Sequence, residues 1–384
     1  MAKGLNKVLF VFFIVVLLAY FYRTAIYWMN YITFDEAVAD NIRFRLIELF
    51  DLFIVAFIFL NGKFHFRGIH AVCFLLLIVM FFVLLYNGAS VSTFFYCLSW
   101  PLLFEATYLF VKDKKERVIQ MVRFYYIVSV IGLWFFINSI ASFDFGLQSN
   151  MIYFFVLTIP VLLLKENRTW RIVILILTTV MALLSMKRSM MLAIALFWFV
   201  TGLVYFLRNG RSKITVLFTG IVIAVVAYYS FIYIDNLSGG YLTERFEMED
   251  VSNGRENLYE NTWNMQLGSS TSEWLLGHGH NAVRDESQGM SAHNEWLEIL
   301  YDYGAVILLL YLFLWIYLLK TWFYHFKTKS NYLIAYTLSI SIFAVMSMVS
   351  QLVLYVSYFL YLVMFWGITE ALCDTEKLEE RAIP

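Results

Sequence analysis

The stretch Ile69-His-Ala-Val-Cys-Phe-Leu-Leu-Leu-Ile-Val-Met-Phe-Phe-Val-Leu-Leu-Tyr86 decides the fold class, because it contains no Lys, Arg, Asp or Glu. A helix needs about 20 apolar residues, with a range of about 17–25, to cross the hydrocarbon layer of a bilayer. The run therefore predicts a transmembrane helix. In the whole chain of 384 residues, 61% are hydrophobic and 15% are charged, against roughly 25% charged in a typical soluble domain. We expect an all-α, polytopic integral membrane protein, which excludes a soluble enzyme, a disordered scaffold and a disulfide-stapled secreted domain.

Charge and cysteine content exclude further classes. The 28 basic and 28 acidic side chains balance, so the chain has no net field that would attract nucleic acid. The three cysteines are scattered without a CxxC spacing, which indicates neither a redox motif nor a thiolate metal site. We expect no cofactor.

Apolar runs predict about twelve membrane-spanning helices. The first is an uncleaved helix, because no small-x-small cleavage site follows the apolar run from Val8 to Tyr22. The expected spans are 5–22, 46–61, 69–86, 91–111, 122–141, 150–164, 170–186, 189–207, 214–234, 301–319, 332–350 and 352–369.

The positive-inside rule tests this count, because cytoplasmic loops carry an excess of Lys and Arg. Twelve spans with both termini in the cytoplasm place 20 of the 28 Lys and Arg residues on the inner side. The expected organisation is nine helices in residues 1–234, a large, partly helical outer-face loop in 235–300, three helices in 301–369 and a charged, non-periodic cytoplasmic tail in 370–384. A loop of this length is usually functional or disordered.

Two adjacent cations, Lys187 and Arg188, lie in the tight outer turn between the spans 170–186 and 189–207. The turn contains no acidic residue that could pair with them. An anionic ligand at the outer membrane surface would account for both charges. Ordinary snorkelling at a helix end accounts for them equally well.

Arg255 begins a second candidate site, because Arg255, Tyr259 and Trp263 fall at four-residue intervals on one helical stripe. An arginine in a first turn opposes the helix dipole. It is favourable where an anion is held together with the free backbone N–H groups. Pairing with Glu256 or Glu260 is the alternative that needs no ligand.

The outer loop also holds His278, His280 and His293. A His-x-His pair with a distant histidine could ligate zinc, but glycine-flanked histidines in a loop are weak evidence for a metal. Asn294 predicts a helix N-cap, with Glu295 and Glu298 in the first turn, and this places His293 on a rigid element. An imidazole titrates near pH 6.5, so a neutral form able to accept a proton is available. The sequence does not fix the direction of its pKa shift.

Three stretches, about a fifth of the chain, resemble the bacterial O-antigen polymerase and O-antigen ligase superfamily. They are Arg188-Ser-Met-Met-Leu192, which matches an Arg-x3-Leu motif; Gly254-Arg255 followed by Trp263 and Gly277-His-Gly279, which is similar to the start of the large outer loop; and His293-Asn294, nine residues and Gly304, which match a His-Asn-x9-Gly motif. The ligase pattern expects Gly, Thr or Tyr three residues after that last glycine. Ile307 departs from it and slightly disfavours a ligase.

The resemblance implies a membrane-embedded, metal-independent, inverting glycosyltransferase of GT-C-like architecture. Its donor would be a polyprenyl-diphosphate-linked oligosaccharide and its acceptor a glycan. Arg188 and Arg255 would hold the diphosphate, since guanidinium groups bind phosphates bidentately, and His293 would orient or deprotonate the attacking sugar hydroxyl. The further substrate-binding candidates are Lys187, Arg245, His278, His280, Tyr259, Trp263 and Asn294.

The resemblance also implies a place and partners. The protein would lie in the bacterial cytoplasmic (inner) membrane, with both termini in the cytoplasm and the active site on the periplasmic or extracellular face. Flippase and chain-length regulator proteins are the expected partners beside the substrates and the bilayer.

Three functions remain open. The first is a polymerase that joins repeat units into O-antigen, capsule or exopolysaccharide. The second is an O-antigen ligase that moves glycan from the lipid carrier to lipid A-core or another acceptor. The third is a lipid-linked glycan flippase or other transporter, which would require an essential intramembrane acid such as Glu105, in the span 91–111.

Overall fold

The described part of the chain is all-helical in the computed structural model. It comprises residues 2–33, 41–61, 68–112, 115–141, 150–165, 167–208 and 255–382, with 220–221, 225, 228–236, 239–240 and 243–244 between the last two ranges. The helices are α1 (Ala2–Thr33), α2 (Asn41–Asn61), α3 (Ile69–Tyr86), α4 (Val91–Val111), α5 (Lys115–Ala141), α6 (Ile152–Val156), α7 (Ile159–Leu162), α8 (Arg168–Leu184), α9 (Arg188–Arg208), α12 (Arg255–Leu267), α13 (Thr271–Leu276), α14 (Ala282–Glu286), α15 (Glu295–Thr328), α16 (Leu333–Val349) and α17 (Val356–Ala382).

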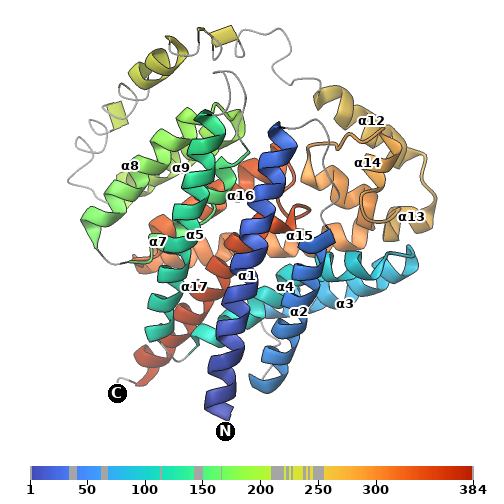
Figure 1. Cartoon of the computed structure of the whole chain (residues 1–384), viewed down its shortest axis with the longest axis horizontal. Coiled ribbons are helices and arrows are strands. Elements are labelled where there is room, and N and C mark those ends of the chain that lie inside the picture. Colours follow the sequence, from blue (N-terminus) through green and yellow to red (C-terminus); the bar gives the residue numbers. More distant parts are fainter. Residues whose placement is uncertain are drawn as a thin grey trace.

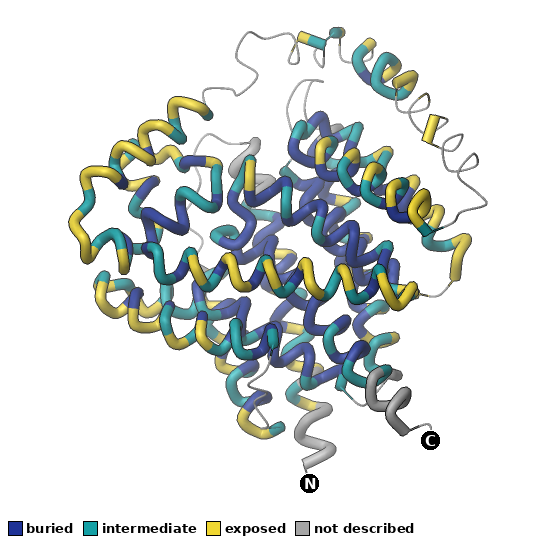
Figure 2. Tube along the Cα trace, turned by 180° about the vertical axis from the view of Figure 1, so that it is seen from behind, coloured by how far each residue is buried: buried dark blue, intermediate teal, exposed yellow. Residues whose placement is uncertain are grey.

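Within these residues, six helices are long and apolar enough to cross a membrane. Many large apolar side chains on the long helices remain exposed, such as Phe82 on α3 at 61% and Phe199 on α9 at 70%. Figure 2 shows the buried interior and the exposed outer faces of the helices. Apolar surface of this extent is stable only in contact with lipid. The protein is therefore an integral membrane protein, as the composition predicts.

The predicted spans agree with the helices to different degrees. The ranges 69–86 and 91–111 coincide with α3 and α4, and 189–207 differs from α9 by one residue at each end. The span expected at 150–164 is instead two short helices, α6 and α7, separated at Leu157–Thr158. Pro160 has no N–H to continue the helix from α6. The count of twelve spans remains a prediction.

Both ends of the chain lie together, at the bottom of Figure 1, and α12, α13 and α14 lie at its upper right. Residues from Glu370 onward extend α17 as far as Ala382, so the expectation of a non-periodic tail was wrong. The Tyr108 hydroxyl donates to the Asp374 carboxylate at 2.8 Å. This contact joins the extended helix to α4.

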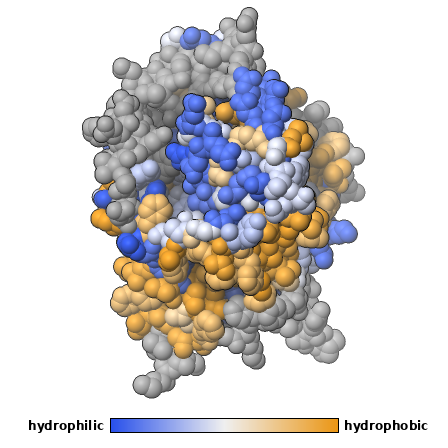
Figure 3. All heavy atoms as spheres, turned by 90° about the vertical axis from the view of Figure 1, so that its right-hand side faces the viewer, coloured by the Kyte–Doolittle hydropathy of each residue, from blue (hydrophilic) through white to orange (hydrophobic). Residues whose placement is uncertain are grey.

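The helices α12, α13 and α14 pack on α15 and so lie against the bundle of long helices. The central helix α17 packs along α4, α9 along α16, and α15 along both α3 and α13. In Figure 3 the face that carries α12, α13 and α14 is hydrophilic in its upper part and apolar below. The polar cap therefore lies on one end of an apolar body, where a membrane protein meets water.

Candidate functional site

The turn between α8 and α9 holds Lys187 and Arg188 on a tight backbone. Buried Met186 adopts a left-handed conformation, with φ 51°, which is uncommon for residues other than glycine and asparagine. The Ser185 hydroxyl accepts the backbone N–H of Lys187 at 3.2 Å. Arg188 is then the first residue of α9. The turn thus fixes where both cations leave the backbone.

The ammonium of Lys187 lies against the bundle rather than in open solvent. It donates to the Asn150 side-chain oxygen and lies 5.7 Å from the centre of the Tyr153 ring. The Tyr153 hydroxyl is hydrogen bonded to Ser189 Oγ at 2.9 Å. These contacts hold the cation beside the start of α9.

Arg255 is likewise the first residue of its helix, α12, with Glu256 in the same turn. Four residues later, the Tyr259 hydroxyl donates to the backbone oxygens of His293 at 3.4 Å and Met348 at 3.2 Å. Tyr259 therefore fastens α12 to the His293 segment and to the end of α16. A positive side chain at a helix start is unfavourable by typically 0.3–1 kcal/mol, and both candidate arginines occupy this position.

His293 is held by the residues around it. Its backbone is left-handed, with φ 53°. Asn294 caps α15 as predicted, because its side-chain oxygen accepts from the backbone N–H groups of Trp296 and Leu297 at 3.1 and 3.3 Å. The buried carboxylate of Glu298 accepts from the backbone N–H groups of Ala292 and His293. The loop is fixed, while the His293 side chain itself is exposed.

The acids beside His293 do not face its ring. Glu295 is fully buried and accepts from the Tyr311 hydroxyl at 2.8 Å and from the backbone N–H of Val353. Gln351 donates its amide to Glu298. Sequence reasoning missed this network. The signal was present, because Glu295, Glu298 and Asp302 follow one another at three- and four-residue spacing on one helical face.

Two cations reach His293 electrostatically. Partial desolvation is the largest cause that lowers the pKa of His293, the charges of Arg255 and Lys187 act in the same direction, and together they bring it to about 4. The charge of Arg255 also acts on the Tyr153 hydroxyl, against which Lys187 lies. Three of the predicted site residues, His293, Arg255 and Lys187, therefore converge, and Arg188 is the chain neighbour of Lys187. The imidazole is neutral at neutral pH and can accept a proton.

His278 has a structural setting. Its Nε2 is hydrogen bonded to Ser269 Oγ at 2.8 Å, and its ring stacks on Tyr301 with centroids 4.1 Å apart. These contacts fix the ring within the group of helices α12, α13 and α14, which is called the outer cap below. Nothing in them points to a ligand.

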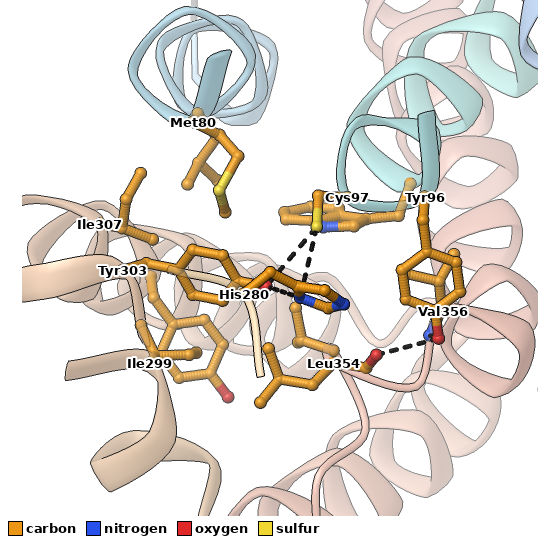
Figure 4. A pocket seen from close by; sticks show the side chains of 13 residues that line it. Met80, Tyr96, Cys97, His280, Ile299, Tyr303, Ile307, Leu354 and Val356 are labelled. Carbon is orange, nitrogen blue, oxygen red and sulfur yellow. Dashed lines mark hydrogen bonds between the residues drawn. The ribbon is translucent and has the colours of Figure 1, made fainter. Parts of the chain in front are cut away.

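His280, unlike His278, points toward α4 (Figure 4). Its Nδ1 is hydrogen bonded to the Tyr303 hydroxyl and lies 3.7 Å from the Cys97 sulfur. Burial lowers the pKa of His280 to about 4. In the part of the chain that the structure describes, no group of three His, Cys, Asp or Glu side chains is placed to hold a metal.

Trp263 is 42% exposed and meets Trp274 edge to face, with centroids 6.2 Å apart. Arg245 lies outside the described residues.

The glycines of the motifs join the outer cap to α15. Gly277 and Gly304 have φ 70° and 81° with ψ near 180°, a region essentially restricted to glycine. A Cβ at Gly304 would collide with the Leu275 carbonyl, and one at Gly277 with the Asp302 carbonyl. The Asp302 carboxylate accepts from the backbone N–H groups of Asn281 and Val283, each at 3.0 Å. These contacts explain the two glycines by backbone packing.

A cavity of about 840 Å³ adjoins the His293 loop. Ser291, Glu298 and Gln351 form the wall nearest that loop. The rest of the lining is aromatic, hydroxyl-bearing and cationic, and includes Tyr27, Phe44, Tyr96, Tyr355, Ser92, Thr93, Arg43, Arg45 and Arg284. Such a lining offers ring faces and hydrogen-bonding groups together, which suits a sugar.

A chain of rings connects the cavity to the cations. Tyr355 contacts Tyr358 at 6.3 Å between centroids, and Tyr358 contacts Tyr153 at 5.4 Å. Arg43 acts electrostatically on Tyr358 from the cavity side. The cavity and the Lys187 ammonium therefore lie on two sides of one tyrosine pair.

The intramembrane acid Glu105 has a partner. His70 Nδ1 is hydrogen bonded to Glu105 Oε2 at 2.6 Å, and both side chains are buried. The pair joins α3 to α4. This contact gives Glu105 a structural setting within the bundle.

Comparison with known families supports the sequence resemblance. Residues 173–312 match the family model described as O-antigen ligase. The match runs from α8 through the outer cap into α15, so it includes Lys187, Arg188, Arg255 and His293. No curated protein matches the chain significantly. The resemblance to the O-antigen polymerase and ligase superfamily is thereby confirmed.

Proposed function

We propose, from the match of residues 173–312 to the family model described as O-antigen ligase, that this membrane protein is an inverting glycosyltransferase. It joins polyprenyl-diphosphate-linked oligosaccharide repeat units into O-antigen, capsule or exopolysaccharide. The observation that carries the proposal is the convergence of Arg255 and Lys187 on the neutral imidazole of His293.

The cations provide the site for the donor's diphosphate. Arg188 and Arg255 are each the first residue of a helix, and the N–H groups of a first helical turn have no intrahelical partner. A diphosphate takes up both kinds of donor and reverses the unfavourable effect of the cations on the helix dipoles. Lys187 adds a third positive charge. Together they neutralise the charge that develops on the leaving group, which is the role of a metal ion in other transferases.

His293 provides the base. Its Nδ1 or Nε2 takes the proton of an acceptor hydroxyl, whose oxygen attacks the anomeric carbon of the donor sugar. The bond from that carbon to the phosphate oxygen breaks, and its electron pair leaves with the diphosphate. Attack from the opposite face inverts the anomeric centre. Help of this kind is worth about 10²–10⁴-fold in rate.

Donor binding would also adjust the base. Besides desolvation, the charges of Arg255 and Lys187 lower the pKa of His293. A diphosphate between them compensates their charge, so the part of the lowering that they cause is removed and the pKa of His293 rises, while the lowering by desolvation remains. The imidazole is then a stronger base when the donor is present. The 840 Å³ cavity with its aromatic and hydroxyl lining receives the glycan.

The proposal also covers the number of membrane spans, the cellular membrane and the side of that membrane on which the site lies. These are about twelve spans in a GT-C-like arrangement, a cytoplasmic membrane location with both termini inside, and a site at the periplasmic or extracellular face. Flippase and chain-length regulator proteins are the proposed partners. The cap helices and both arginines lie at the end where α8 finishes and α9 begins, which supports a single-sided site.

An O-antigen ligase is the second candidate, favoured by the description of the matching family. Both enzymes use the same donor chemistry, so the acceptor separates them. Ile307 departs from the ligase pattern and is 2% exposed among apolar side chains. We favour the polymerase for this reason.

Reconstitution separates the alternatives. The purified protein is placed in vesicles with lipid-linked repeat unit and no other acceptor. A ladder of chain lengths identifies a polymerase, whereas transfer only after addition of lipid A-core identifies a ligase. Translocation without any new glycosidic bond would refute both and favour a transporter.

A further inference from the structure

A second polar pocket lies at the opposite end of the bundle from the His293 loop. It has a volume of about 190 Å³ and lies between the start of α8, the end of α9 and the turn from α15 to α16. The two ends are distinct, because α9 begins at Arg188 beside the outer cap and ends at Arg208 in this pocket. The pocket is therefore separate from the site of the proposed reaction.

Among the described residues, the lining carries three positive charges and no acid. Arg171, Arg208 and Lys329 come from three different segments, and the other lining residues are Thr201, Val204, Tyr205, Ser330, Asn331, Leu333, Ile334 and Thr337. Three cations brought together without a carboxylate repel one another. A negatively charged occupant would remove that repulsion.

Both arginines are anchored on one side and have an unused nitrogen on the other. Arg171 donates its Nε to the Lys165 carbonyl at 2.7 Å, while its buried Nη2 has no hydrogen-bond partner. Arg208 donates Nη2 to the His325 carbonyl at 3.0 Å and to the Phe326 carbonyl, while its buried Nε has none. Each guanidinium is thus held in place with a donor to spare.

A third polar atom in the pocket is also unpartnered. Thr201 is 8% exposed, and its hydroxyl oxygen makes no hydrogen bond. Buried polar groups are paired in the great majority of proteins, so a group of three unpaired atoms at one pocket calls for a missing partner. The donors fit an acceptor with several oxygens, and the charges require it to be an anion.

The surroundings identify the source of the anion. Tyr205 in the lining is 43% exposed, and the neighbouring Phe206, Leu207 and Ile172 are 41%, 63% and 48% exposed. Long apolar side chains therefore cover the surface beside a cationic pocket at the end of three helices. This is the arrangement expected where acyl chains lie along the protein and a headgroup turns inward.

We propose that this pocket binds the phosphate of an anionic phospholipid. The phosphate oxygens accept from Arg171, Arg208 and Thr201, and Lys329 adds charge from the turn. A zwitterionic lipid carries its own ammonium group and compensates the three cations less well. The bound lipid links α8, α9 and the α15–α16 turn, and stabilises the bundle at this end.

The test uses the full protein in detergent, with phosphatidylglycerol, phosphatidylcholine or inorganic phosphate added at matched concentrations. Thermal unfolding and native mass spectrometry report stabilisation and bound lipid. We expect phosphatidylglycerol to raise Tm and to remain bound, with little effect from the other two. The variant Arg171→Gln/Lys329→Gln should bind it about 25-fold more weakly, at about fivefold for each charge removed.

The matched control is Lys320→Gln/Lys327→Gln, which removes two exposed charges from the same end of α15 without touching the pocket. It should behave like the wild-type protein. Thr201→Val, which keeps the charge and nearly the shape, should also weaken binding. An equal Tm rise in the pocket variant and the control would overturn the proposal. So would an equal response to phosphatidylcholine, or a response to inorganic phosphate as large as that to the lipid, which would indicate a site for a soluble anion.

Discussion

Replacing Gly304 by Ala tests whether the outer cap and α15 act as one rigid unit. Gly304 has φ 81° and ψ 174°, and a residue with a Cβ is strained there by about 1–3 kcal/mol. The added Cβ would also collide with the Leu275 carbonyl and the Gly277 nitrogen. Both are backbone atoms that cannot rotate away, and forced overpacking costs typically 1–3 kcal/mol more. We expect a total loss of about 2–6 kcal/mol.

The functional consequence follows from the position of the contact. The cap must move off α15 to admit the Cβ, and this shifts the segment that carries His293 relative to Arg255. Chain-length ladders from reconstituted protein should therefore shorten or disappear. Thermal unfolding of the purified protein in detergent gives the loss of stability.

Gly202→Ala is the matched control, because Gly202 lies inside α9 with no atom within 4 Å of the position of its Cβ. That substitution should change stability by no more than about 1 kcal/mol and leave the ladders intact. If Gly304→Ala is as stable and as active as Gly202→Ala, the rigid connection between cap and α15 is refuted.

Three further predictions concern the chemistry. His293→Ala should reach the membrane normally but yield only single repeat units on the carrier lipid, as gel analysis of extracted lipid would show; long chains in that variant would contradict the role of the base. Arg188→Lys should lower transfer at least tenfold, because one ammonium cannot replace a planar guanidinium; unchanged turnover would leave Arg188 as a helix-end anchor. The acid limb of kcat/KM should lie near pH 4 rather than 6.5, since the pKa of His293 is lowered to about 4, and Lys187→Gln should move the limb to higher pH because one lowering charge is removed. A limb near pH 6.5 in both proteins would show that another group controls it.

The sequence predicts the membrane helices where composition alone decides them. α3 and α4 coincide with their predicted ranges, because a long run with no charged residue, or with the single acid Glu105 in α4, satisfies its backbone groups in lipid as a helix. The short helices α6 and α7 depart from the prediction. There the Thr158 hydroxyl donates to the Phe155 carbonyl at 2.6 Å. A side-chain hydrogen bond thus satisfies a backbone carbonyl at the break between the two helices, just before Pro160.

The sequence predicts which residues form the candidate site, but not which residues hold them in place. The motifs identify His293, Arg188 and Arg255 by order along the chain. The partners that hold the His293 loop lie far away, since Glu298 meets Gln351 and Glu295 meets Val353 across more than fifty residues. A single sequence contains no signal for pairing over such a separation. The direction of the His293 pKa shift was open for the same reason, because Lys187 and Arg255 approach it from other helices.

The diphosphate of the proposed donor would account for three features that are each unfavourable alone: the positions of Arg188 and of Arg255, and the lowered pKa of His293. Arg188 and Arg255 stand at helix starts, where positive charge opposes the dipole. Lys187 and Arg255 add to the desolvation that lowers the pKa of His293, which weakens it as a base. Ordinary surface arginines would gain nothing from this placement and would be screened by solvent. In the proposed mechanism a diphosphate would act on all of them: it would pair with the guanidiniums, accept from the N–H groups at the helix starts and remove the part of the pKa lowering that Lys187 and Arg255 cause. In the proposed mechanism the imidazole therefore becomes a stronger base when the donor binds.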